Sequence, residues 1–114
     1  MSASNAGKTN PGNYFEDFSL GQVFAHATPR TVTDGDIALY TGLYGGRFAV
    51  QSSVEFAKGL GYAAQPVDDL LTFHIAFGKT VPEVSLNAVA NLGYAEGVFG
   101  APVYAGDTIR ATSE

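Results

Sequence analysis

The sequence has 114 residues, a formal net charge of −5 and 46% hydrophobic residues, a composition typical of one globular domain. Its six Lys and Arg residues are scattered singly, which argues against nucleic-acid binding and against a polybasic membrane anchor. Because there is no cysteine, disulfides, thiolate nucleophiles and sulfur metal sites are excluded. Two histidines are too few to build a typical catalytic zinc site.

The first residues predict a lead-in followed by one domain. Residues 1–12 are small and polar, without the apolar stretch of a signal peptide or a transmembrane helix. We therefore expect a flexible lead-in over residues 1–12, a domain over residues 13–114, and a cytoplasmic protein. Leu20-Gly21-Gln22 is typical of a turn, and the alternation from Val23 to Thr28 predicts a strand.

Two helix starts follow. Thr33, with Asp36 three residues later, has the form of a capping box, and the Gly pair at 45–46 should end this helix. Ser53 begins a second, shorter helix that Gly59 and Gly61 limit.

The third helix should be the strongest and largely buried. Asp68 or Asp69 can cap its N-terminus, and Pro82 should stop it. Apolar residues cover most of its surface, and one stripe consists of Leu70, His74, Phe77 and Val81.

The sequence pattern after residue 87 predicts strands. Residues 88–99 and 102–104 are rich in strand-forming residues, Ala105-Gly106-Asp107 forms a tight turn, and residues 108–113 alternate again. A buried helix followed by antiparallel strands predicts an α+β fold, in which a curved sheet wraps the helix. Three or so strands cannot wrap a helix that is apolar nearly all round. We therefore expect a fold that is truncated before its last strands.

Three segments carry a family resemblance. Residues 43–51 together with Phe56-Ala57, residues 66–71, and residues 101–108 resemble the signature segments of the MaoC-like, R-specific enoyl-CoA hydratases. Within that family, the sequence is most similar to the mesaconyl-CoA hydratase group, also called β-methylmalyl-CoA dehydratases. This similarity is carried by residues 14–18, 77–82 and 85–97. The resemblance implies a hot-dog fold, an antiparallel sheet around a central helix. It also implies that this chain is the N-terminal unit of a two-unit protein.

The implied reaction is a reversible addition of water to an enoyl-CoA thioester, a hydro-lyase reaction with no cofactor beyond the CoA of the substrate. It needs a carboxylate and an imidazole as acid and base. At the positions where the family carries this pair, the sequence has Gly46 and Gln51, and Asp68-Asp69 replaces the family's His-Gly at the helix start. We therefore expect no catalytic residue and no metal in this unit, and an inactive fragment whose role is to shape or bind the substrate.

The resemblance leaves several roles open. Candidate substrate-binding residues are Arg47, Gln51 and Asp69, although Arg47 fits a surface salt bridge equally well, and the Asp pair fits a helix cap better. Expected partners are the acyl-CoA thioester, a C-terminal hot-dog half, and a second copy in a homo-oligomer such as a dimer. The alternative function is a non-catalytic acyl-CoA-binding or scaffold module, and a thioesterase is a weaker third.

The two histidines are expected to be structural. The position of His74 on the apolar stripe favours a core residue that is hydrogen-bonded within the fold. His26 lies in a predicted strand, where an exposed or half-exposed structural role is the better interpretation.

Overall fold

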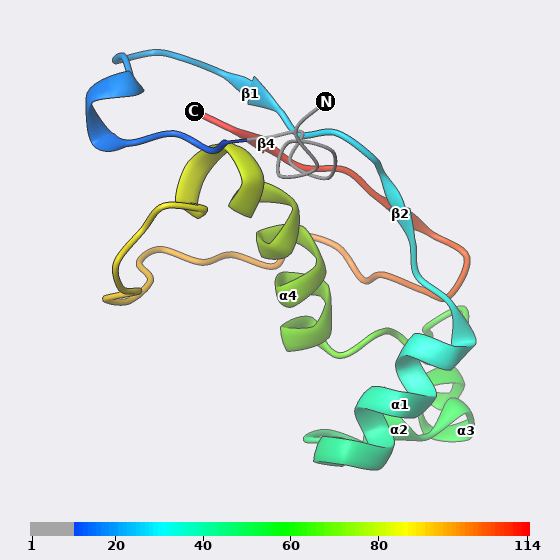
Figure 1. Cartoon of the computed structure of the whole chain (residues 1–114). Coiled ribbons are helices and arrows are strands. Elements are labelled where there is room, and N and C mark those ends of the chain that lie inside the picture. The colour runs from blue at the N-terminus through cyan, green and yellow to red at the C-terminus, as the bar shows by residue number, and fades with distance from the viewer. Residues whose placement is uncertain (1–10) are drawn as a thin grey trace, which may run out of the picture.

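The computed structural model describes residues 11–114, so most of the predicted lead-in lies outside the described residues. Figure 1 shows a two-stranded ribbon on one side, the helix α4 beside it, and the helices α1, α2 and α3 clustered at one end. In chain order the elements are η2 Phe15–Asp17, β1 Phe24–Ala25, β2 Arg30–Thr31, α1 Asp34–Tyr44, α2 Ala49–Ser52, α3 Val54–Gly59, α4 Asp69–Thr80, η3 Val81–Ser85, β3 Thr108–Ile109 and β4 Thr112–Ser113.

The ribbon pairs the predicted first strand with the last segment of the chain. β1 pairs with β4 and β2 pairs with β3, both antiparallel. Between these ladders, residues 26–29 lie opposite residues 110–111, so the first strand bulges. Thr28, with a φ of 60°, and Pro29, which has no N–H, lie in this bulge. The predicted turn at residues 105–107 forms directly before β3, with Gly106 at a φ of 98° and its N–H donating to the Val32 carbonyl.

The three predicted helix starts are confirmed. Thr33 accepts a hydrogen bond from Asp36 N and forms a capping box with it, and Gly45, at a φ of 71°, ends α1. Ser53 caps α3 by accepting from Phe56 N. At α4 the cap is Asp68, whose carboxylate accepts from Leu70 N.

The prediction that this third helix is buried is wrong. No residue of α4 is buried, and Leu70 is 40% exposed. The α-helix ends at Thr80, before Pro82, but the chain continues through the wider π-helical turn η3, which contains Pro82. Pro82 lies in the first turn of η3, where its missing N–H removes no hydrogen bond of that turn.

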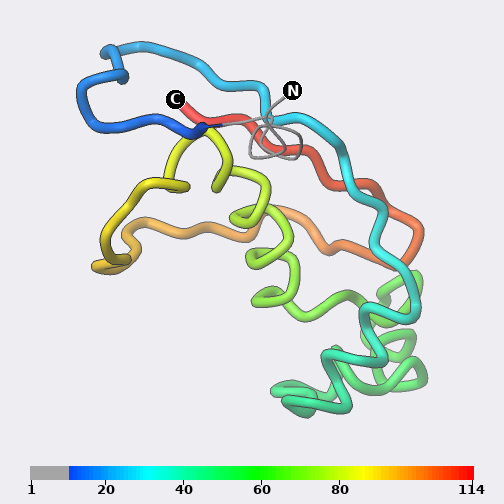
Figure 2. The backbone as a smooth tube through the Cα atoms, viewed as in Figure 1, coloured from blue at the N-terminus to red at the C-terminus, as the bar shows by residue number. Residues whose placement is uncertain are grey.

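The strands predicted at residues 88–99 and 102–104 are absent from the described structure. This stretch crosses beside α4 as an extended segment (Figure 2) and is held to the helix by Tyr94, whose ring contacts Phe73 and Phe77 edge-on at 5.0 and 5.6 Å. A strand needs a hydrogen-bonding neighbour, and along residues 88–99 the described chain offers none. Val89 and Leu92 are 102% and 97% exposed.

The resulting molecule is open. Its radius of gyration is 17.5 Å, whereas a compact domain of this length has about 13 Å. In the described part of the chain the fully enclosed apolar residues are Val32, Ala57 and Val67. These three lie where α1, α3 and the start of α4 meet the ribbon and the segment near Val103, whose carbonyl accepts from Val67 N. The core is therefore confined to the end of the molecule that carries the candidate site.

Candidate functional site

The loop between α1 and α2 contains Gly46, where the family resemblance implies a carboxylate. α1 ends at Gly45, and α2 begins three residues after Gly46. A Cβ atom at Gly46 would lie 2.5 Å from Ser52 Cβ and 2.9 Å from Ser52 Oγ. The close approach of Ser52 therefore leaves no room for a side chain here, and a carboxylate could enter only if α2 moved.

Gln51 and Asp68 are the buried polar side chains next to this loop. Their exposed fractions are 9% and 8%, and both line a small cavity of about 10 Å³ together with Tyr40, Gly46 and others. Gln51 Oε1 and Asp68 Oδ2 accept no hydrogen bond from any residue that the structure describes. The other Asp68 oxygen accepts from Leu70 N at 2.8 Å. The side-chain oxygen of Gln51 can thus accept a hydrogen bond from a ligand, but the amide cannot act as a base near pH 7.

Tyr40 lines both this small cavity and a much larger cleft. Burial, and then the negative charge of Asp68, raise the pKa of Tyr40 above its usual value of 10.0, while Arg47 acts in the opposite direction. Its ring packs against Tyr44 at 5.0 Å. Tyr40 comes from α1 and Asp68 from the N-terminus of α4, so only the tertiary structure brings the two side chains to one cavity.

The three predicted substrate-binding residues are only partly brought together. Gln51 and Asp69 line one cavity of about 300 Å³, which Phe48 and Pro102 also line. Asp69 is exposed at the first turn of α4. Arg47 is exposed in the loop and lines none of the cavities described here.

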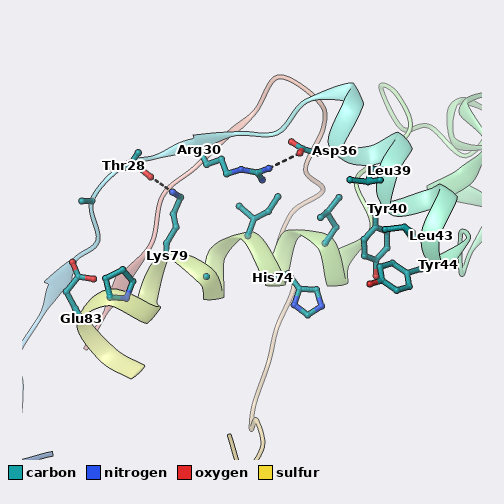
Figure 3. A pocket seen from close by; sticks show the side chains of 15 residues that line it. Thr28, Arg30, Asp36, Leu39, Tyr40, Leu43, Tyr44, His74, Lys79 and Glu83 are labelled. Carbon is teal, nitrogen blue, oxygen red and sulfur yellow. Dashed lines mark hydrogen bonds and ion pairs between the residues drawn. The ribbon is translucent and has the colours of Figure 1, made fainter. Parts of the chain in front are cut away.

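A cleft of about 800 Å³ lies between the bulged strand, α1 and α4 (Figure 3). Its wall is mainly apolar, and charged groups bridge its upper rim in this view. Arg30 binds Asp36 at 2.7 Å, and Lys79 donates from α4 to the carbonyl of Thr28 in the bulge. The apolar part of the lining consists mostly of Leu39, Tyr40, Leu43, Tyr44, Leu71 and Ile75.

The exposure predicted for each histidine is wrong, although the structural role predicted for His26 agrees with its contacts. His74 is exposed at the edge of the large cleft (Figure 3) and contacts the ring of Phe73. His26 is the buried one: its side chain is fully enclosed, Nδ1 lies 3.0 Å from Glu83 Oε2, and Nε2 lies 2.6 Å from Ser113 Oγ. η3 and β4 enclose His26 from opposite sides, and no local sequence pattern specifies that arrangement.

The Ser113–His26–Glu83 arrangement has the atom order of a nucleophilic triad, with the carboxylate on Nδ1 and the hydroxyl on Nε2. A nucleophile also needs space for a substrate and donors for an oxyanion. None of the cavities described here is lined by His26 or Ser113. These three residues therefore tie β1, β4 and η3 together.

Within residues 11–114, no group of three His, Asp or Glu residues is placed to hold a metal ion. No described helix has the length and apolar character needed to cross a membrane.

Comparison with known proteins identifies the class. The MaoC like domain family matches residues 17–114, so the chain belongs to that family and its α+β fold is a hot-dog fold. A solved structure of a MaoC domain protein dehydratase from Chloroflexus aurantiacus J-10-fl is similar with a TM-score of 0.87 and 68% identity, over 92% of this chain and 30% of that one. A monoamine oxidase regulatory protein from Archaeoglobus fulgius follows with a TM-score of 0.73 and 30% identity, over 89% and 69% of the two chains.

Two curated relatives narrow the class. The β-methylmalyl-CoA dehydratase of Chloroflexus aurantiacus is 67% identical over 107 residues, which are 94% of this chain and 30% of that protein. The mesaconyl-CoA hydratase of Cereibacter sphaeroides is 60% identical over 106 residues, or 93% and 31%. The chain therefore spans less than a third of the length of the curated relatives it matches.

Proposed function

We propose that this chain is the N-terminal unit of an acyl-CoA hydro-lyase that interconverts mesaconyl-CoA and β-methylmalyl-CoA by reversible addition of water. Its identity of 60–67% to two relatives with these names carries the proposal. Such identity over nearly the whole chain favours a common reaction over a common fold alone.

In this proposal the unit shapes or binds the substrate and does not perform the chemistry. Neither Gly46 nor Gln51 can serve as acid or base, and Ser52 occupies the space that a carboxylate at Gly46 would need. The acid/base pair then comes from another unit. Gln51 and Asp69, which share one cavity, and the exposed Arg47 stay candidates for contacts with the acyl-CoA.

A second hot-dog half is the proposed partner. The extended segment 88–99 has neither a strand neighbour in the described structure nor cover for Val89, Leu92 and Val98. An unpaired edge with apolar side chains favours pairing with further strands. Homo-oligomerisation as a dimer and a cytoplasmic location belong to the same proposal.

A complementation assay tests the function. The 114-residue chain is produced alone, and then together with the part of the Chloroflexus aurantiacus relative that it does not cover. Mesaconyl-CoA hydration is followed by the loss of the absorbance of the enoyl thioester. We expect no turnover from the chain alone and turnover from the pair. The relative's own first third, supplied to the same remaining part, is the matched control.

The assay also separates the alternative function. If the control pair is active, and the present chain restores no activity but binds a CoA thioester, a non-catalytic acyl-CoA-binding module is the better description. Turnover by the chain alone would show that residues assigned here to packing or binding perform the chemistry.

A further inference from the structure

The small cavity between α1, α2 and the start of α4 has an unusual lining for its size. Two side chains that are more than nine-tenths buried, Gln51 and Asp68, each contribute an oxygen that has no hydrogen-bond donor among the described residues. A buried polar atom without a partner costs about 1–3 kcal/mol, and a charged one costs more. Two such atoms on one cavity point to a shared ligand.

The chemistry of the two oxygens defines that ligand. Gln51 Oε1 and Asp68 Oδ2 are both acceptors, so they cannot satisfy each other, and their occupant must donate hydrogen bonds. The occupant need not be a cation, because Leu70 N and the N-terminus of α4 already offset part of the Asp68 charge. Acceptor groups such as a carboxylate or a thioester oxygen are excluded.

The volume defines the size of the ligand. The cavity measures about 10 Å³. One water molecule needs about 10–15 Å³ and two to four polar partners. The cavity is therefore no larger than one water molecule requires. Tyr40, which also lines the cavity, carries a hydroxyl that can accept or donate.

We infer that Gln51 and Asp68 hold one buried water molecule, which donates one hydrogen bond to Gln51 Oε1 and the other to Asp68 Oδ2. This inference deepens the proposed function, on which it partly rests. The unit binds this water where its family has an acid/base pair. The Asp68 carboxylate accepts from it, but no histidine lines the cavity to complete such a pair. The site fixes the loop at Gly46 against α4, and the thioester oxygen of a substrate binds elsewhere.

Water magnetic relaxation dispersion on the 114-residue chain tests the inference, because it counts water molecules that stay bound for longer than the protein tumbles. Gln51→Met keeps the length of the side chain and removes the acceptor. We expect this variant to lose one long-lived water molecule relative to the unchanged chain. Gln22→Met makes the same chemical change outside the cavity and should lose none, since Gln22 lies in the turn that it caps at Ser19 N.

Three outcomes would overturn the inference. The first is an equal count of long-lived water molecules in the unchanged chain and in Gln51→Met. The second is a crystal structure in which the Gln51 amide is turned, so that Nε2 donates directly to Asp68. The third is a melting temperature that rises with ammonium chloride but not with tetramethylammonium chloride, which would assign the site to a small cation. None of these readouts depends on hydratase activity, so this inference and the proposed function can fail separately.

Discussion

The two histidines provide a direct test of the structure, because the sequence and the fold assign them opposite environments. His26→Ala removes a fully enclosed imidazole that bonds Glu83 at 3.0 Å and Ser113 at 2.6 Å. Each hydrogen bond contributes about 1 kcal/mol, and the space left behind adds a cavity cost, so the expected loss is about 2–4 kcal/mol in the free energy of unfolding. The matched change His74→Ala removes an exposed ring and should cost less than about 0.5 kcal/mol.

Urea denaturation followed by circular dichroism measures both variants under one set of conditions. If His26→Ala does not fold, Ser113→Ala gives a milder version, since it removes one of the two bonds and should cost about 1 kcal/mol. A larger loss from His74→Ala than from His26→Ala would refute the placement of both side chains. It would return His74 to the core position that its apolar stripe favours.

Three further changes test the helix start, the half-buried Tyr40 and the crowded loop at Gly46. Thr33→Ala removes the acceptor of Asp36 N and should lower stability by about 1 kcal/mol in the same assay. The Thr33 backbone N–H, more than any other group, lowers the pKa of Asp36, so the contribution of the Asp36 carboxylate should be present at neutral pH and be lost as acidification protonates it. An equal loss from Asp36→Asn at pH 7 and pH 2 would contradict this. Burial raises the pKa of Tyr40, so the folded chain keeps the phenolic proton to a higher pH than the unfolded chain does. The free energy of unfolding should therefore fall as pH rises above about 10. Tyr40→Phe should reduce that fall in alkaline urea titrations. Gly46→Ala should destabilise the chain by about 1–3 kcal/mol, because the added methyl group overpacks against Ser52. Adding Ser52→Gly should restore part of that stability in the double variant. A Gly46→Ala variant as stable as the unchanged chain would show that the loop moves to make room at little cost.

The sequence alone predicted those parts of the molecule whose causes are local. Thr33, Ser53 and Asp68 each cap a helix through a hydrogen bond that spans two or three residues, so a short motif contains all the information. The family resemblance is likewise visible in the sequence, and it predicts that Gly46 and Gln51 stand where the family has its acid/base pair. The sequence did not predict the four-residue helix α2, because no side-chain cap marks its start.

The tertiary structure decided what depends on residues distant along the chain. His26 is buried because Glu83 and Ser113 reach it from 57 and 87 residues away, whereas His74, on an apolar stripe, is exposed because no element covers that side of α4. Residues 88–99 have strand-forming side chains but form no strand, since backbone hydrogen bonds in a sheet require a neighbour that the described chain does not supply. Local hydrogen bonds follow from sequence, but burial and strand pairing follow from the element that packs opposite.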